Sequence, residues 1–459
     1  MRTKDYRDIL ENSLDQIRTP MMSDASPTSY SHDSDAQLVA RPVTCIANSS
    51  DEPFPAFARA PIPSAHTAQW QATSLFSGCG GLDLGFLQQG IMSRGAYDIN
   101  ASALATYSAN LPGAAFHADL SRFTPNGLCG EVLLAGAPCQ GFSTAGKRRL
   151  EDPRNALLMR VADIALKGRP KVLLVENVPA AYSGSHRKLW TALEDRLRLA
   201  GYNVRRMLLG GETCGMAQRR KRLFLLCWLG SDCVRVGFDA QAPVQLKEVL
   251  RGVQFTTDHD PEWPEEGCRD WIVARKIKPG HKLSSVRLGD RAVATWDIPE
   301  IFGETNESER NVLKAVARLR RRQRIRNEGD GDPVHLDRIE IDCGRDVRKC
   351  VQRLVEVGYL RSVDDCYELR QTYNGRYRRL EWNSVSPTVD TRFGRIDLFI
   401  HPTEDRGMTY REAARIQGFP DSFGFIGTKS EKFSQIGNAV PPPMAAVLAQ
   451  FLRDAILKA

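Results

Sequence analysis

Cys139 is a residue whose type and position in this sequence are suited to catalysis. It follows the apolar run LLAGAP and precedes Gln, Gly and Ser, which places it in a turn at the end of a strand. Backbone amides and nearby Arg side chains in such a turn can lower the pKa of a thiol and make it a nucleophile. For a single cysteine the alternative is a packed residue without a reactive role.

An acid, an amide and two arginines stand at comparable positions further along the chain. Glu176 and Asn177 end the apolar run in KVLLVENVP, where burying an acid without a function would be unfavourable. A solvated cap is the alternative. Arg220 and Arg222 belong to QRRKRLF, which opens another apolar run. Taken alone, such a basic run is usually a solvated face.

A glycine-rich turn and two acids indicate a nucleoside site. The segment FSGCGGLDLGF puts Gly78 and Gly80 between a strand and a helix, where the backbone can turn sharply and approach a ligand. The spacing departs from the G-x-G-x-x-G fingerprint, so the alternative is a tight turn without a ligand. Asp98 and Asp119 follow at the ends of the next two strands. One such acid is usually a helix cap, but two after a glycine-rich turn favour a bound nucleoside.

The elements that must position these residues alternate between strands and helices. From Thr73 to about residue 230, short apolar runs such as KVLLVEN alternate with amphipathic stretches such as KLWTALEDRLRLAG. This alternation predicts an α/β fold with a doubly wound, mostly parallel sheet, which binds ligands at the carboxyl ends of its strands. An Arg-rich composition follows at 231–384, and a compact apolar pattern returns at 385–459.

The Arg-rich region predicts a smaller inserted α+β domain. A helix is followed there by YLRSV and by a hairpin turning on Asn374 and Gly375, which is typical of a winged-helix-like unit, placed at 309–382. The basic runs VLKAVARLRRRQRIR and RYRRLEW suit phosphate and base-edge contacts, with a solvated charge run as the alternative. The predicted helix carries the apolar residues Val347, Val351, Leu354 and Val355 and ends at Gly358.

Composition limits the class of protein. The 459 residues allow two or three domains, and a net charge of +8 permits a polyanionic partner. The 11 cysteines show neither C-x-x-C nor zinc-ligand spacing, which indicates reduced thiols, a reducing compartment and no metal site. No apolar run reaches the ~18 residues of a membrane span, and no secretory signal opens the sequence. We therefore expect a soluble internal protein with no membrane contact and a disordered tail at 1–70.

Together these motifs resemble the DNA cytosine-5 methyltransferases, in that family's own order. GAPCQGFS followed by ENV and Q-R-R-x-R is highly specific, and the matching segments lie at 71–230 and 385–459. The resemblance implies an S-adenosylmethionine-dependent methyltransferase fold whose catalytic domain is interrupted by a target recognition domain at 231–384. The segments are FSGCGGLDLGF, DINASALATYSAN, GAPCQGFS, DPRN, VENV, QRRKRLF, REAARIQGFP and QIGNAVPPP.

The resemblance also implies a site for S-adenosylmethionine, the methyl donor, with no metal. Phe76 would stack on the adenine, Asp98 would hold the ribose, and Asp119 would contact the adenine amine. The two glycines would approach the methionine moiety, and an asparagine from the far end of the chain would close the pocket. The full set of implied cofactor-binding residues is Phe76, Gly78, Gly80, Asp98, Asp119, Pro138 and Asn438.

For the reaction, the resemblance implies a covalent route. The Cys139 thiolate would add to C6 of a flipped-out cytosine, while Glu176 hydrogen-bonds or protonates N3. Asn177 would orient Glu176 and the base. Arg222 would contact O2 of the cytosine, and Arg220 would support the pocket.

These expectations define a DNA (cytosine-5)-methyltransferase that modifies a specific sequence in double-stranded DNA, as in restriction and modification. The basic loop at 141–155 would close on this DNA. We expect a monomer on DNA in the bacterial cytoplasm, associated with the nucleoid, and a cognate restriction endonuclease acting on the same site.

Three alternatives stay open. A transfer RNA methyltransferase would use the same chemistry, but the large basic insert argues against it. A catalytically silent DNA-binding regulator is disfavoured by the intact Cys139, Glu176 and Arg222. A nicotinamide oxidoreductase follows from the fold alone, and the glycine spacing and the thiol turn argue against it.

Overall fold

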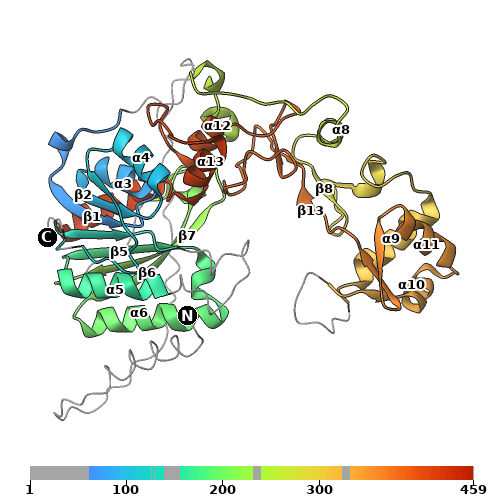
Figure 1. Ribbon diagram of the computed structural model, residues 1–459, viewed down its shortest axis with the longest axis horizontal. Helices are drawn as coiled ribbons and strands as arrows, with labels where there is room; N and C mark the ends of the chain where they lie inside the picture. Colours follow the sequence, from blue (N-terminus) through green and yellow to red (C-terminus); the bar gives the residue numbers. More distant parts are fainter. Residues whose placement is uncertain are drawn as a thin grey trace, which may run out of the picture.

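The computed structural model describes residues 61–125, 127–128, 130–138, 156–230, 239–322 and 331–457. The loop predicted at 141–155, most of the tail predicted at 1–70, and Cys139 lie outside these residues. Within the described part, a large sheet with its helices forms one lobe, and a smaller lobe extends from it (Figure 1). None of the helices in this part combines the length and the apolar character that a bilayer crossing requires.

The large lobe is built on a seven-stranded sheet with the order β3-β2-β1-β4-β5-β7-β6. The pairings from β3 to β5 are parallel, and β7 is antiparallel to both of its neighbours. The predicted doubly wound, mostly parallel sheet is therefore confirmed. The strands are β1 Trp70–Leu75, β2 Ile91–Asp98, β3 Ala114–His117, β4 Val132–Ala135, β5 Val172–Asn177, β6 Asn203–Gly210 and β7 Lys221–Trp228.

Helices cover both faces of this sheet, and this explains why its central strands are apolar throughout. In β4, Val132 and Leu134 pack with α3 and α14, whereas Leu133 and Ala135 pack on the other face with α5 and α6. Because successive side chains of a strand point to opposite faces, two buried faces require an unbroken apolar run. The helices are α3 Gly81–Leu87, α5 Ala156–Gly168, α6 Arg187–Leu199 and α14 Pro442–Leu452.

The end of the chain completes the large lobe. The helix α14 lies directly against α3, where a Cβ atom on Gly85 would come within 2.4 Å of the Pro442 carbonyl oxygen. A third core joins α4, α12 and α13 to α7, although α7 follows the predicted domain boundary at 230. The boundaries at 230 and 384 remain predictions. The bounds are α4 Ala101–Asn110, α7 Leu246–Val249, α12 Tyr410–Gln417 and α13 Lys429–Asn438.

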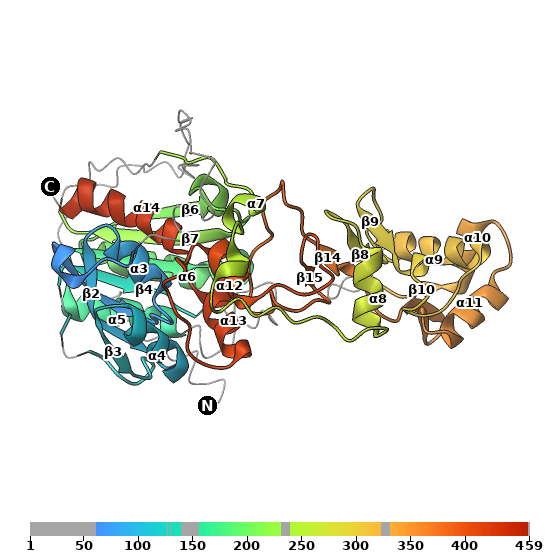
Figure 2. The same cartoon turned by 90° about the horizontal axis from the view of Figure 1, so that it is seen from above.

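A bridge with its own small core lies between the lobes. Its helix α8 packs with a three-stranded sheet in the order β13-β8-β9, and the pair β14 and β15 joins the insert to the returning chain. Figure 2 shows these elements between the seven-stranded sheet and the outer helices. The bounds are α8 Arg269–Lys276, β8 Lys282–Ser284, β9 Ala292–Ala294, β13 Asn374–Arg376, β14 Arg378–Arg379 and β15 Phe399–Ile400.

The outer part of the insert follows the order α9-β10-α10-α11-β11-β12 among the described residues. Its strands form a sheet in the order β10-β12-β11, and its helices share a core to which α11 contributes Val351 and Leu354. The helix predicted at these residues is confirmed, and the order of elements supports the winged-helix-like unit, which remains a prediction. The bounds are α9 Glu307–Leu319, β10 Val334–His335, α10 Leu336–Cys343, α11 Arg348–Glu356, β11 Leu360–Val363 and β12 Cys366–Leu369.

The hairpin predicted at Asn374 and Gly375 is wrong. The chain instead reverses between β11 and β12, which pair antiparallel, and β13 pairs with β8. The Asn-Gly signal is local, whereas strand register is decided by where the flanking side chains find a core. Here Tyr373 and Tyr377 pack in the core of the bridge and carry the segment between them away from β12.

Candidate active site

The centre of the candidate active site is a buried ion pair between Glu176 and Arg222. Glu176 comes from the end of β5 and Arg222 from the start of the neighbouring β7, and Oε1 of the glutamate lies 2.7 Å from Nε of the arginine. The two side chains are 10% and 12% exposed. Burial raises the pKa of Glu176, and the charges of Arg222 and Arg220 offset this effect only in part. The carboxyl group is therefore suited to carry a proton at a pH where an ordinary glutamate is ionised.

Arg220 anchors the segment that carries Arg222. It is fully buried. Its Nη1 donates to the carbonyl of Val389 at 2.8 Å, and its Nη2 donates to those of Gly437 and Ala439 at 2.9 Å. Its hydrogen bonds thus join the residue before β7 to two segments of the returning chain. The supporting role in the pocket that the resemblance implied remains a prediction.

Asn177 supports the turn that leads toward Cys139. Its Nδ2 donates to the carbonyl of Ala137 at 3.4 Å, and its Oδ1 accepts from the Val178 backbone N–H at 2.9 Å. The side chain thereby ties the end of β5 to the end of β4. The role that the resemblance implied for Asn177, to orient Glu176 and the base, remains a prediction.

The glycine-rich turn and Asp98 meet at the carboxyl ends of β1 and β2. The Gly78 N–H donates to Oδ2 of Asp98 at 2.8 Å, and the Asn100 N–H donates to Oδ1 at 2.8 Å. Gly78 has a φ of +55°, and a Cβ atom there would meet no atom within 4 Å, so its backbone is open to a ligand. Gly80, in contrast, packs closely on Leu111 and shapes the turn.

Phe76 and Pro138 lie at the ends of adjacent strands. Phe76 follows β1 with a φ of +55°, a conformation that costs free energy in a residue with a side chain and that concentrates at functional sites. Its ring packs against the core shared by α5 and α6. The Gly136 N–H donates to the Leu75 carbonyl at 3.1 Å, which brings the segment ending in Pro138 alongside.

Asp119 and Asn438 occupy exposed positions at the same edge of the lobe. Asp119 follows β3 and accepts from the Ser121 backbone N–H at 3.0 Å, and hydrogen bonds from Ser121 lower its pKa. Asn438 ends α13 and donates to Ser434 at 3.3 Å. The Cys79 thiol donates to the Gln435 carbonyl at 3.7 Å and so places α13 against the glycine-rich turn.

Two residues that sequence analysis did not single out belong to this description. Ile99 follows Asp98 at the carboxyl end of β2 and leaves 63% of its surface exposed, which is unusual for a large apolar side chain. Gln218 is fully buried, donates to Gln417 Oε1 at 2.8 Å and accepts from the Val389 N–H at 2.8 Å. Gln218 opens QRRKRLF, so its position in the motif was the available signal, whereas Ile99 had none.

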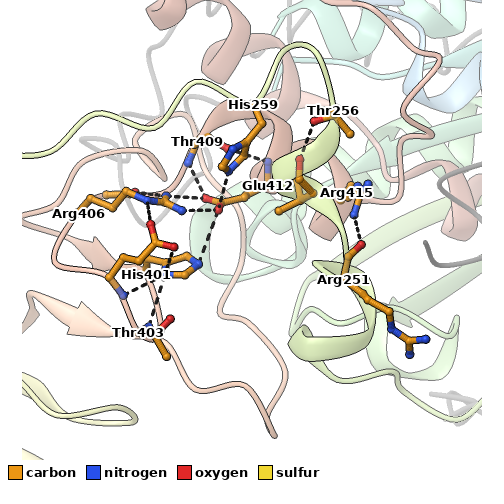
Figure 3. Close-up of polar contacts among 12 residues, drawn as sticks. Arg251, Thr256, His259, His401, Thr403, Arg406, Thr409, Glu412 and Arg415 are labelled. Atoms are coloured by element: carbon orange, nitrogen blue, oxygen red, sulfur yellow. Dashed lines mark hydrogen bonds and ion pairs between the residues drawn. The ribbon is translucent and has the colours of Figure 1, made fainter. Parts of the chain in front are cut away.

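A buried charge network joins the large lobe to the insert (Figure 3). Glu412, at the start of α12, accepts from Arg406 at 2.8 and 3.0 Å and lies 3.2 Å from Nε2 of His259 and 3.7 Å from Nε2 of His401. Burial alone would raise the pKa of Glu412, but the hydrogen bonds from His259 and Arg406 outweigh it and lower this pKa to about 2. The Thr409-x-x-Glu412 capping box was visible in the sequence, but the histidine partners were not.

The described residues contain no group of three or more His, Cys, Asp and Glu side chains arranged to hold a metal ion. The predicted site residues of this part fall into two neighbouring sets at one edge of the sheet. One set surrounds Glu176 and Arg222, and the other surrounds the glycine-rich turn and Asp98. Parallel strands end at a common edge, which is why segments so far apart in the sequence meet here.

Comparison with known proteins relates this geometry to a family. Residues 70–453 match the family model of the C-5 cytosine-specific DNA methylases. The type II methyltransferase M.AgeI of Thalassovita gelatinovora is 29% identical over 429 residues, which cover 83% of this chain and 99% of that protein. M.XorII of Xanthomonas oryzae pv. oryzae is 29% identical over 404 residues, 84% of each chain.

A solved structure shows the same fold. It is described as a DNA modification methyltransferase encoded within an E. coli prophage, with a TM-score of 0.52 and 23% identity over 85% of this chain and 99% of that one. Because the family model spans both lobes and the bridge between them, the chain belongs to the C-5 cytosine-specific DNA methylases.

Proposed function

We propose that this enzyme methylates C5 of a cytosine extruded from duplex DNA, through a transient bond between the Cys139 sulfur and C6. The observation that carries the proposal is the buried pair of Glu176 and Arg222 at the end of β5. The end of β4, from which the chain continues to Cys139, is tied to this same edge by Asn177. Cys139 itself lies outside the described residues, and its role rests on the family motif.

The need for these groups follows from the substrate. C5 of cytosine is a poor nucleophile, and addition of a thiolate to C6 makes it part of an enamine that can attack a methyl group. Glu176, with its raised pKa, places a proton on N3 and neutralises the charge that develops there. Loss of the C5 proton then expels the thiolate and restores the aromatic ring. Arg222 holds the carboxyl group of Glu176 and is positioned to contact O2.

The burial of Glu176 requires that the base leave the duplex. A carboxyl group that is only 10% exposed at a strand end cannot reach N3 of a stacked and paired cytosine. Extrusion costs a few kcal/mol, which protein contacts to the DNA must offset. We therefore assign double-stranded DNA as the substrate and base flipping as part of the reaction.

We infer that S-adenosylmethionine binds at the carboxyl ends of β1, β2 and β3. When bound, it supplies a methyl group activated by a sulfonium centre. Gly78 offers an open backbone, and Asp98, fixed by two backbone N–H groups, keeps lone pairs for the ribose hydroxyls. Phe76 and the exposed Ile99 provide apolar surface for the adenine, and Asp119 is available to its amine.

A mechanism-based trap tests the proposal. Fluorine at C5 replaces the proton that must leave, so a random-sequence duplex containing 5-fluorocytosine should become covalently attached to the enzyme in the presence of S-adenosylmethionine. We expect a denaturation-resistant adduct, mapped by peptide mass spectrometry to Cys139. Cys139→Ser should form none, and the matched control Cys366→Ser, altered at a cysteine of β12, should form as much as the unmodified enzyme. An adduct at another residue, or none at all, would refute the covalent route.

The biological setting can be tested separately. The type II relatives lead us to infer a role in restriction and modification, with an endonuclease that cuts the same site and a monomeric enzyme acting in the bacterial cytoplasm. Bisulfite sequencing of DNA from a host that expresses this chain should show methylcytosine at one sequence. Methyl transfer to transfer RNA in place of duplex DNA would identify the alternative substrate, and transfer to neither would identify a silent DNA-binding protein.

A further inference from the structure

Two cations of the bridge lie side by side above a glycine. The ideal Cβ position of Gly375 lies 3.0 Å from Nη2 of Arg378 and 3.8 Å from Nζ of Lys282. Both charged groups therefore gather around one point on the surface of β13 and β8. Gly375 has a φ of +91° and leaves the space that a side chain would take from the two cations.

Neither cation has a counter-charge within the described residues. In the described part of the chain, no acidic side chain forms an ion pair with Lys282 or Arg378, and neither side chain donates a hydrogen bond to a protein acceptor. Neighbouring arginines behave differently. Arg376 and Arg395 both pair with Asp397, and Arg379 donates to four backbone carbonyls.

The electrostatic environment of the two cations is unfavourable in the protein alone. Burial, together with the charges of Arg378 and Arg287, lowers the pKa of Lys282. Burial and the charge of Arg219 lower the pKa of Arg378. Like charges that are gathered without a counter-charge destabilise a fold, and such clusters mark sites where an anion is expected to bind.

The position of the cluster relates it to the candidate active site. Arg219 belongs to the same segment as Arg222, and its exposed side chain lies 3.7 Å from its only ion-pair partner among the described residues, Glu212. Its backbone N–H donates to the Ser386 carbonyl at 2.8 Å, just beyond the insert. Figure 2 shows β14 between the seven-stranded sheet and the outer helices, so the cluster lies where the two lobes meet.

We propose that Lys282 and Arg378, with Arg219 at the rim of the active site, form a phosphate-binding site that holds the DNA backbone beside the extruded cytosine. The inference rests on the proposed function, because it names the group that positions the duplex at that same site. A DNA strand carries phosphates at close and regular spacing, so it can neutralise all three cations at once. Such contacts fix the position of the duplex without reading its sequence.

The test is the salt dependence of DNA binding. Fluorescence anisotropy with the full chain and a labelled random-sequence duplex gives the slope of log Kobs against log [KCl]. For Lys282→Gln and for Arg378→Gln we expect weaker binding and a slope smaller in magnitude by about 0.9 for each phosphate that the variant no longer neutralises. The slope of the double variant should decrease by about twice as much, and Arg378→Lys, which keeps the charge, should retain most of the slope.

Controls separate this inference from folding and from the proposed function. Arg94→Gln removes an exposed charge from β2 and should leave the slope unchanged. The melting temperature of Lys282→Gln should not fall, because the substitution relieves repulsion, and its affinity for S-adenosylmethionine should equal that of the unmodified enzyme. Unchanged slopes in both single variants, with DNA binding by the unmodified enzyme intact, would overturn the phosphate site alone. Failure of the unmodified enzyme to bind any duplex would contradict the proposed function as well.

Discussion

The large lobe and the insert each contain a basic segment, QRRKRLF and RYRRLEW. The two segments look alike in sequence, and each contains one buried arginine that binds backbone carbonyls. Arg220 in the first and Arg379 in the second are buried, and both donate to backbone carbonyls of segments distant in the sequence. Each strand is thereby fixed by one arginine that never reaches the surface.

The remaining arginines of the two segments differ. Arg222 pairs with a buried carboxyl group, Glu176, whereas Arg376 pairs with Asp397, whose side chain is 17% exposed. Arg378 pairs with no acid of the described residues. A basic run is therefore not one functional surface. Acceptors brought by other parts of the chain divide it into anchors, ion pairs and cations available to a ligand.

Removing the acid of the large lobe should have the largest effect. Glu176→Gln keeps the size of the side chain but removes the proton that we assign to N3. We expect kcat to fall by about 10²- to 10⁴-fold, measured by tritium transfer to duplex DNA. Affinity for S-adenosylmethionine, measured by calorimetry, should stay the same, and a parallel loss of that affinity would contradict the assigned role.

The same acid predicts a pH dependence. Because burial raises the pKa of Glu176, its protonated form persists to a higher pH than that of an ordinary glutamate. The rate of the unmodified enzyme should decline as the pH rises through this raised pKa, provided that binding of DNA is saturated. Glu176→Gln should lack that decline, and an identical alkaline limb in both proteins would assign it to another group.

The junction of the two regions offers the next test. Glu412→Gln removes the buried charge partner of Arg406 and leaves this arginine only the partly exposed Glu404. We expect a loss of about 3–5 kcal/mol in the free energy of unfolding at pH 7, from urea titration. Glu431→Gln is the matched control, because it closes the same kind of capping box on the exposed start of α13. The control should lose only about 1 kcal/mol.

Lowering the pH should reduce the stability difference between the unmodified enzyme and Glu412→Gln. The pKa of Glu412 falls from an ordinary value of 4.5 to about 2 in the fold, so its contribution is present above about pH 4.5 and is lost as the pH falls toward 2. The unfolding free energies of the unmodified enzyme and of Glu412→Gln, plotted against pH, should therefore converge between pH 5 and the acid transition. A constant difference over that range would mean that the charge of Glu412 does not supply the stability.

Within RYRRLEW, substitutions at two neighbouring arginines should affect stability differently. Arg379→Met leaves several buried carbonyls and Asp405 without their donor, and we expect a loss of about 2–3 kcal/mol of unfolding free energy. Arg378→Met should cause no loss, because no acceptor in the part of the chain that the structure describes depends on that side chain. Equal effects of the two substitutions in thermal and urea unfolding would refute this division of the run.

The smallest effect is expected at the start of the chain. Removal of residues 1–60 takes away a segment that precedes the family match at 70–453 and contributes no proposed site residue. Methyl transfer and unfolding free energy should stay close to those of the full chain. An inactive truncated enzyme would show that these residues take part in the fold or in substrate binding.

Much of the candidate site could be predicted because its chemistry restricts the residue types. An acid at the end of an apolar strand, two acids after a glycine-rich turn and a pair of arginines before a strand are visible as local patterns, and the sheet brings them to one edge. The insert offered no such restriction. Its true hairpin, between β11 and β12, carries no Asn-Gly signal, while the Asn-Gly pair that suggested a hairpin lies in β13.

The sequence by itself determined the alternation of strands and helices in the large lobe and the types of the groups at its strand ends, because burial on two faces and reactivity both act on single residues and their near neighbours. Only the tertiary structure decided which arginine became an anchor, which paired with Glu176 and which stayed without a counter-charge. The tertiary structure also placed His259 and His401 next to the carboxyl group of Glu412. These outcomes depend on partners that other segments of the chain contribute, and no local pattern records which segments will meet.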